Sequence, residues 1–496
     1  MGQPTDPLVA ANRFGLGPRP GELARIAADP RGHVEAQLAD PTAARLTAPD
    51  LMASDRAMRE ARAAERVRQA ERARAAEAGP AAGGKTPPGP AATPVPAMAG
   101  NPMPAMAAGP APAMMAPGKP PAAAKPPLPI EAEIFRREQI ARLARFCETE
   151  TPLLERLVLF WSNHFAVSET KGNPVRVTVG AMEREAIRPH VLGRFADMLK
   201  AVETHPAMLV YLDNNQSIGP QSLNGRNSKR GLNENLAREI MELHTLGVAG
   251  GYAQTDVTAL ARVLTGWTFA NPDEDDFHGG RFTFAPGRHE PGTHQVVGRS
   301  YPENGHAQGL AVLDDLARHP ATARHLAFKL ARHFVDDQPP AELVDRLARV
   351  WRDSDGDLAA VTRALVTAPE AWRAEARKLR APIEFVVAMQ RAIGRPADVG
   401  AANGALAALG QPTWAPPGPD GWSDEAAAWA SPAGLSTRLD LAVQFARHAG
   451  DREPASLAAD LWGEALPEAT RVAIRRAESR QQGIALLFAS PEFQRR

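Results

Sequence analysis

Apolar residues recur every three or four positions along most of this chain, and this spacing limits its fold more than any other feature. It is clearest in three stretches that are interrupted by proline or glycine: 141–165, 314–335 and 357–376. Such spacing places apolar side chains on one face of an α-helix, whereas a half-buried strand needs alternation. Alternating runs are scarce, and the clearest pair flanks a Pro/Gly turn at 281–298, which predicts a β-hairpin. We therefore expect an all-α fold, an irregular multi-helix globular body with one small hairpin.

One long stretch of the chain lacks the composition of a folded segment. Residues 79–129 hold 16 of the 46 prolines and five of the 13 methionines, with no aromatic or acidic residue. This stretch cannot bury enough apolar surface to offset its conformational entropy, so we predict a disordered Ala/Pro/Met-rich insert. We expect residues 1–78 to form an N-terminal helical segment of the main body, and 130–496 to form the main helical domain. Proline and glycine breaks at 392–419 mark a candidate subdomain boundary.

The charge balance excludes several classes of protein. Lysine plus arginine equals aspartate plus glutamate at 57 each, so no net field attracts a nucleic acid or an anionic membrane. No run of about 18 apolar residues predicts membrane insertion. The N-terminus lacks the basic start and apolar core of a signal peptide, which predicts a cytoplasmic protein. The single cysteine, Cys147, excludes an intramolecular disulfide.

Residues 233–247, NENLAREIMELHTLG, carry the densest chemistry of the chain and predict one amphipathic helix. Asn233 is a candidate N-cap residue, and His244 lies near the edge of the apolar side. The polar side carries five residues: Glu234, Asn235, Arg238, Glu239 and Glu242. Two interpretations are open. The polar face is solvated, with an i,i+4 pair such as Glu234 to Arg238, or another element covers it and creates a cluster with shifted pKa values.

A second candidate is His164, which lies among Phe160, Trp161 and Phe165. Such a histidine is either a core residue with one hydrogen bond or a ligand. Glu239 and Glu242 lie one helical turn apart, a spacing that suits an acid and base pair or a bridged metal. We therefore name Glu239, Glu242 and His164 as catalytic candidates. The candidate ligands of a divalent metal ion are His164, Glu239, Glu242 and His244.

Two further segments carry candidate binding residues. The loop that starts at Asp213 is rich in amide and carboxylate oxygens, which suit Ca²⁺ or sugar hydroxyls but also ordinary turns. His289 lies on the predicted hairpin with Glu290 and His294. These three could bind zinc or iron, or the hairpin could fold over the body as a flap with His289 hydrogen-bonded beneath it. We favour the flap.

Many segments resemble one bacterial family. The motifs that carry the resemblance are NRFGLGPRPGEL at Asn12, FWSNHFAVS at Phe160, HPAMLVYLDNNQS at His205, NENLAREIMELHTLG at Asn233 and GYAQTDVTALARVLTGWTF at Gly251, with others through Trp422. Together they are similar to the family called domain of unknown function 1800. Arg262, Lys329, Lys378 and Glu384 also match family motifs, and we expect Arg262 to form a buried bridge with Glu239 or Glu242. Relatives are often exported and encoded beside a sulfatase-like protein of family 1501, so the resemblance implies export with such a partner.

These observations support two hypotheses of different classes. The first is a hydrolytic or metal-assisted enzyme that acts on envelope polysaccharide through the Glu/His cluster. Its candidate binding residues are Asn233, Glu234, Asn235, Arg238, Arg262, Asp213 and His289. The second is a non-catalytic scaffold or export partner of the sulfatase-like family 1501 protein, in which the same residues form a buried structural network. An enzyme needs those residues within reach of solvent, whereas a scaffold exposes an apolar patch elsewhere.

Overall fold

The computed structural model describes residues 6–77, 127–228, 230–273, 278–375, 378–394 and 398–496. The chain divides into two compact units, residues 1–63 with 130–496, and residues 64–129. The predicted disordered insert lies outside the described residues, except for 127–129. The candidate site residues all belong to the first unit.

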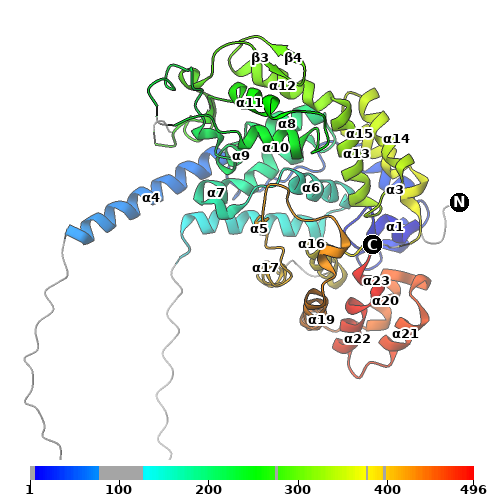
Figure 1. Ribbon diagram of the computed structural model, residues 1–496. Coiled ribbons are helices and arrows are strands. Elements are labelled where there is room, and N and C mark those ends of the chain that lie inside the picture. The colour runs from blue at the N-terminus through cyan, green and yellow to red at the C-terminus, as the bar shows by residue number, and fades with distance from the viewer. Residues whose placement is uncertain (1–5, 78–126, 229, 274–277, 376–377, 395–397) are drawn as a thin grey trace, which may run out of the picture. The chain divides into compact units, whose positions relative to one another are not determined.

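The first unit is mostly helical, as the spacing of apolar residues predicted (Figure 1). The longest helix of the N-terminal segment is α4, whose residues fall on both sides of the boundary at Ala63. The helices of the first half of the chain are α1 (Asp6–Asn12), α2 (Glu22–Ile26), α3 (Pro30–Ala36), α4 (Ser54–Glu77), α5 (Ile130–Glu148), α6 (Pro152–His164), α7 (Asn173–Met182), α8 (Phe195–Glu203), α9 (Pro206–Tyr211) and α10 (Asn235–Glu239).

Helices also dominate the second half of the chain. They are α11 (Gln254–Val263), α12 (His306–Arg318), α13 (Pro320–Phe334), α14 (Ala341–Asp353), α15 (Leu358–Val366), α16 (Pro382–Ile393), α17 (Val399–Ala408), α18 (Ala426–Trp429), α19 (Pro432–Ala446), α20 (Pro454–Trp462), α21 (Glu468–Arg475), α22 (Arg480–Ala489) and α23 (Pro491–Gln494). No helix in the described part of the chain is long and apolar enough to cross a membrane.

The strands differ from the single hairpin predicted at 281–298. Two strands do lie there, β2 (Phe282–Phe284) and β3 (His294–Val296), but they do not pair with each other. β2 pairs antiparallel with β1 (Trp267–Phe269), and β3 pairs antiparallel with β4 (Arg299–Tyr301). The turn between β3 and β4 is Val297-Gly298, where both residues have positive φ, as the two-residue turn of a tight hairpin requires. The hairpin is therefore shifted toward the C-terminus of the predicted segment.

The core consists of two large clusters of buried apolar side chains and a small third cluster around Met58. The larger one collects helices from α1 to α15 and includes Trp161 and Trp351. The second includes Phe385 and Phe488 and is built mainly from α5 and from the helices after α15. The two clusters share α6, because α6 contributes Val158 to the first and its neighbour Leu159 to the second.

The central place of α6 follows from its sequence, PLLERLVLFWSNH. Proline at its first turn is suited to a helix start, and most of its side chains are buried on every side. Even Glu155 and Arg156 are fully buried, and each has partners of opposite charge. Figure 1 shows α6 in the middle of the unit, with α10 on one side and α16 on the other. His164, the last residue of α6, is thereby carried into the interior.

Candidate functional site

The predicted helix at 233–247 is present, but its second half is wound more loosely than an α-helix. The side-chain oxygen of Asn233 accepts a hydrogen bond from the Asn235 amide at 2.9 Å, so Asn233 caps the start as predicted. α10 then passes into a π-helical turn, Ile240–His244, and the chain leaves at Gly247 with a φ of 82°. Such turns are rare and are often found at functional sites. Here the turn leaves His244 fully buried.

The first turn of α10 carries an ordinary surface network. Glu234 pairs with Arg238 at 3.3 Å, and its two carboxylate oxygens also accept hydrogen bonds from Gln254 and Thr258 at 2.7 Å each. Exposed pairs of this kind contribute about 1 kcal/mol or less to stability. For Glu234 and Arg238 the solvated interpretation is therefore correct.

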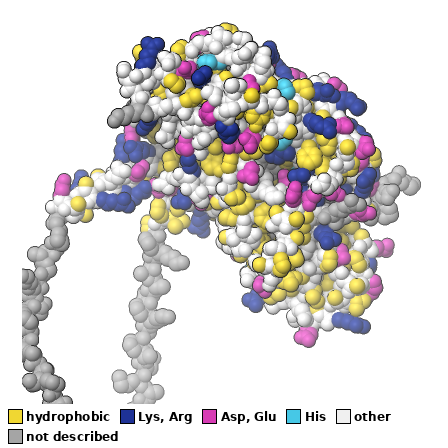
Figure 2. Space-filling view, in the orientation of Figure 1, with side chains coloured by type: hydrophobic (Ala, Val, Ile, Leu, Met, Phe, Trp, Pro, Cys, Tyr) yellow, Lys and Arg dark blue, Asp and Glu magenta, His cyan; other side chains and the backbone are white. Residues whose placement is uncertain are grey.

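Glu239 and Glu242, farther along, are different. Both are half-buried, and neither forms a hydrogen bond or an ion pair with any residue that the structure describes. Burial raises the pKa of Glu239, and the carboxylates of Glu242 and Asp420 raise it further, against the opposite effects of His244 and Arg238. Asp420 belongs to the loop 411–424 and is exposed. Figure 2 shows acidic side chains gathered on the face over α10.

Two tyrosines lie close to these carboxylates. Burial raises the pKa of Tyr211, and Asp420 and Glu239 raise it further. Burial also raises the pKa of Tyr252, with contributions from Glu242 and Glu239 in the same direction. Both rings are partly exposed. The carboxylates and tyrosines therefore form a partly solvated acidic patch, which we call the Glu239 patch.

His164 lies beneath this patch in the aromatic setting that the sequence predicted. Its ring contacts Phe165 and Trp161, with centroid distances of 4.5 and 5.4 Å. Lys329 Nζ lies 3.1 Å from its Nδ1, and the His244 carbonyl lies 3.2 Å from its Nε2. An ammonium can only donate, so Nδ1 accepts from Lys329 and Nε2–H donates to His244. Burial, and then Lys329, hold the pKa of His164 well below its ordinary value, so the ring is neutral.

His244 forms a second buried pair, with Glu203 of α8. Its Nδ1 lies 2.8 Å from Glu203 Oε1, and both side chains are fully buried. No residue that the structure describes bonds to His244 Nε2. Glu203 thus orients the imidazole through one nitrogen and leaves the other nitrogen free. This arrangement suits a general base, provided that a proton donor can reach the free nitrogen.

The predicted metal ligands do not come together as a ligand set. Both ring nitrogens of His164 are occupied, and the Lys329 ammonium beside it repels a cation. Across the described ranges, no three His, Cys, Asp or Glu side chains are placed to hold a metal ion. His164, Glu239, Glu242 and His244 therefore do not form the predicted metal site within the part of the chain that the structure describes.

Three other candidate binding residues lie apart from the Glu239 patch: two have other partners, and the third faces solvent. Asp213 forms an ion pair with Lys171 at 2.7 Å. His289 Nδ1 bonds to the Thr265 carbonyl at 2.9 Å beneath the strand segment, as in the flap interpretation. Arg262 is exposed and forms no ion pair with the described residues, so the expected buried bridge to Glu239 or Glu242 is absent. Its position on α11 turns it toward solvent instead.

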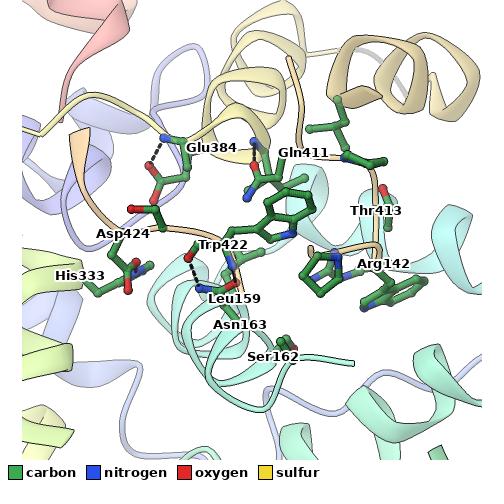
Figure 3. Close-up of a pocket in the computed structure, with 18 of the residues that line it drawn as sticks. Arg142, Leu159, Ser162, Asn163, His333, Glu384, Gln411, Thr413, Trp422 and Asp424 are labelled. Atoms are coloured by element: carbon green, nitrogen blue, oxygen red, sulfur yellow. Dashed lines mark hydrogen bonds and ion pairs between the residues drawn. The ribbon is translucent and has the colours of Figure 1, made fainter. Parts of the chain in front are cut away.

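The structure contains a pocket that was not predicted from the sequence (Figure 3). The loop 411–424 carries Asp420 of the patch and also lines the pocket with Trp422 and Asp424. Asn163 of α6 fixes this loop, because its amide bonds the backbone N–H and carbonyl of Trp422 at 2.7 and 2.8 Å. On the wall, His333 Nδ1 lies 2.9 Å from Asp424 Oδ1.

Two histidines that sequence reasoning missed, His325 and His333, share a signal with Lys329, which the family motifs had already marked. His325, Lys329 and His333 occur at four-residue intervals on α13, so they form a polar stripe along one face of this helix. That stripe could have been found from the sequence alone. Glu203, Asp420 and Asp424 offer no comparable pattern, because only the tertiary fold brings them to His244, Glu239 and His333, respectively.

Comparison with known proteins gives one match. Residues 9–495 match the family model described as Protein of unknown function (DUF1800). No curated protein and no solved structure matches the chain. Because the matched range covers nearly the whole sequence, the chain belongs to the DUF1800 family.

Proposed function

We propose that this protein is a hydrolytic enzyme that cleaves glycosidic bonds of an envelope polysaccharide at the Glu239 patch. The observation that carries the proposal is the pair of carboxylates Glu239 and Asp420. They come from segments far apart in sequence, and each is within reach of solvent. Asp420 also lies close enough to raise the pKa of Glu239.

Glycoside hydrolysis needs two carboxyl groups in opposite protonation states. A raised pKa suits Glu239 to the role of acid, which protonates the leaving oxygen as the C–O bond breaks. The exposed carboxylate of Asp420 then acts as the base that takes a proton from the attacking water, or as the nucleophile. Water supplies the hydroxyl of one fragment, and the proton from Glu239 completes the other. The separation of the two carboxyl groups decides between inversion and retention of configuration.

The other catalytic candidates have supporting roles in this proposal. Glu242 adds to the effect of burial in raising the pKa of Glu239, which favours the protonated form of the acid. His164 accepts a hydrogen bond from Lys329, whose pKa is lowered by burial and partly restored by Asp424 and Asp420. The charge of Asp420 therefore reaches Lys329, although no hydrogen bond or ion pair joins these two side chains. The choice of envelope polysaccharide rests on the frequent export of relatives in the resembling family.

The test measures the release of reducing ends from purified peptidoglycan and from chitin. We expect the natural protein to release them, and Glu239→Gln and Asp420→Asn to lower kcat at least 100-fold, since general acid–base catalysis contributes about 10²–10⁴. Glu234→Gln is the matched control, because it removes a carboxylate from the same helix that already has three partners. Absence of release by the natural protein, or an equal loss in the control, would overturn the proposal.

A second candidate function is that of a scaffold or export partner for the sulfatase-like family 1501 protein. A specific observation favours it: Leu435, Leu439 and Val443 follow one another at four-residue intervals on α19 and are 42%, 52% and 47% exposed. An exposed apolar stripe of this kind is typical of a protein-binding surface. We expect the two proteins to co-elute in size-exclusion chromatography, and Leu439→Glu to separate them.

The control for the scaffold is Leu223→Glu, which changes a leucine that is 79% exposed and distant in sequence from the stripe. Co-elution that survives Leu439→Glu, or that is lost equally with Leu223→Glu, would contradict a role of α19.

A further inference from the structure

The pocket in Figure 3 has apolar walls and a small number of polar groups. Its cavity has a volume of about 80 Å³ and lies between α6, α13, α16 and the loop 411–424. Its apolar side includes Trp414, Trp422, Pro412 and Leu159. Ligand pockets in proteins share this composition, in which apolar walls supply contact and a few polar groups set orientation.

Two polar groups of the wall lack a protein partner. His333 is 7% exposed, and no residue that the structure describes bonds to its Nε2. Gln411 uses its side-chain oxygen to accept from the Ile383 amide at 2.8 Å, while its Nε2 donates to none of the described residues. A buried group without a partner is costly unless a ligand or water satisfies it.

The hydrogen-bonding role of each group can be assigned. The carboxylate of Asp424 only accepts, so His333 Nδ1 carries the hydrogen that bonds it. Burial lowers the pKa of His333 despite Asp424, which leaves Nε2 as a neutral acceptor. Gln411 Nε2 is a donor. The pocket therefore offers one acceptor and one donor. A ligand hydroxyl can donate to the acceptor, and a neighbouring carbonyl or hydroxyl oxygen of the ligand can accept from the donor.

The charged side chains of the wall are already neutralised. Arg142 pairs with Glu183 at 2.7 Å, and Glu384 pairs with Arg496 at 2.8 Å and with Arg156. The Asp424 carboxylate accepts a hydrogen bond from the neutral His333, and its counter-charges are the ammonium groups of Lys329 and Lys378. Because every charge has a partner of opposite sign, a charged ligand would find no counter-ion in this wall. The electrostatics favour a neutral ligand over a phosphate or a carboxylate.

We propose that this pocket binds one neutral pyranose ring of the glycan. The choice of a sugar among the neutral ligands rests on the proposed function. The indoles contact the apolar C–H face of the sugar, His333 Nε2 accepts from a ring hydroxyl, and Gln411 Nε2 donates to a second oxygen. Since the same loop carries Trp422 and Asp420, the pocket places the bound ring next to the Glu239 patch.

The test uses N-acetylglucosamine as the probe and isothermal titration calorimetry as the measurement. Gln411→Glu removes the donor but keeps the oxygen that accepts from Ile383, so the start of α16 is retained. We expect at least tenfold weaker binding of the sugar to this variant. The matched control is Gln37→Glu, because Gln37 is also buried and accepts from the Leu153 amide at 2.9 Å near the proline-led start of α6.

Binding of indole, a flat ring without hydroxyls, separates the sugar from a merely apolar ligand. Sugar binding that is weakened by Gln411→Glu and unchanged by Gln37→Glu supports the proposal. No sugar binding, or indole binding that is tighter than sugar binding and insensitive to Gln411→Glu, overturns it. A second readout is Trp422→Ala, which keeps the backbone bonds to Asn163 and removes the stacking surface; we expect a loss of at least tenfold there as well.

Failure of this inference differs from failure of the proposed function. Glu239→Gln leaves the pocket intact, so it should bind N-acetylglucosamine as the natural protein does. Sugar binding without release of reducing ends from any glycan would keep the pocket and reject the hydrolase. Release of reducing ends without sugar binding in the pocket would keep the hydrolase and reject the sugar pocket.

Discussion

Glu239 owes its raised pKa to burial and to neighbours that can be changed singly. Glu242→Gln removes a negative neighbour and lowers the pKa of Glu239, whereas Arg238→Ala removes a positive neighbour and raises it. If Glu239 is the acid, activity falls as pH rises through its pKa. The basic limb of kcat/KM against pH should therefore move to lower pH in Glu242→Gln and to higher pH in Arg238→Ala.

The opposite directions of these two shifts make the prediction specific to Glu239. Glu453→Gln, which removes an exposed carboxylate next to α20, serves as the control and should leave the limb in place. If the basic limb of the pH profile shifts in the same direction in both variants, or in neither, then a group other than Glu239 determines this limb.

His325 should couple stability to pH. Its Nε2 donates to the Leu243 carbonyl at 3.2 Å, and burial followed by Lys329 lowers its pKa to about 4. Between about 6.5 and 4 the unfolded chain binds a proton that the folded chain does not, so stability falls as pH falls. His325→Gln keeps a donor for Leu243 and should reduce this slope by at most about 1.4 kcal/mol per pH unit. Urea unfolding at several pH values measures it, with exposed His448→Gln as the control.

Site residues could be predicted from the sequence where the pattern that indicates them lies within one short segment. His164 among three aromatic residues, and the cap at Asn233, were predicted and are present. Glu203 and Asp420 were not, because each meets its partner only after the chain has folded back over many residues. Arg262 was assigned to a buried bridge because its charge suited one, yet it faces solvent.

At the scale of elements, the π-helical turn at Ile240–His244 positions His244 against Glu203. Thr245 stabilises this turn, because its hydroxyl donates to the Ile240 carbonyl at 2.6 Å in a fully buried place. Thr245→Val keeps the shape and removes the bond, which should lower the free energy of unfolding by about 1–2 kcal/mol. Thr367→Val is the matched control, since exposed Thr367 makes the corresponding bond to Arg363 at 2.8 Å. Equal losses in both variants would contradict the special role of the buried turn.

Periodicity predicted the helices well and the strands poorly, for a physical reason. A helix satisfies its backbone locally, so its residues reveal it. A three-residue strand needs a partner, and the partners of β2 and β3 lie outside the segment in which both were predicted. The loose turn that ends α10 also escaped prediction, because an amphipathic pattern does not distinguish α from π winding.

At the scale of the whole first unit, α6 and a buried charge cluster join the two cores. Arg156 on α6 donates to the Gly15 carbonyl at 2.8 Å and pairs with Glu384 on α16. Arg496 pairs with the same carboxylate at 2.8 Å. Burial alone would raise the pKa of Glu384, but Arg156 and Arg496 outweigh it and hold the pKa well below its ordinary value. No sequence pattern could reveal this cluster, since its members are separated by more than 100 residues.

Glu384→Gln should therefore destabilise both cores together. Loss of one partner leaves two buried arginines without their counter-ion, which costs about 3–5 kcal/mol. The natural protein should lose stability as pH falls below about 4.5, where the unfolded carboxyl binds a proton that the folded one resists, and the variant should lose this dependence. Calorimetry should show one unfolding transition that moves as a whole. Glu370→Gln breaks a partly exposed pair with Arg346 and should cost less than about 1 kcal/mol. A transition that splits in Glu384→Gln, with one half unmoved, would show that the cores unfold independently and that the cluster does not couple them.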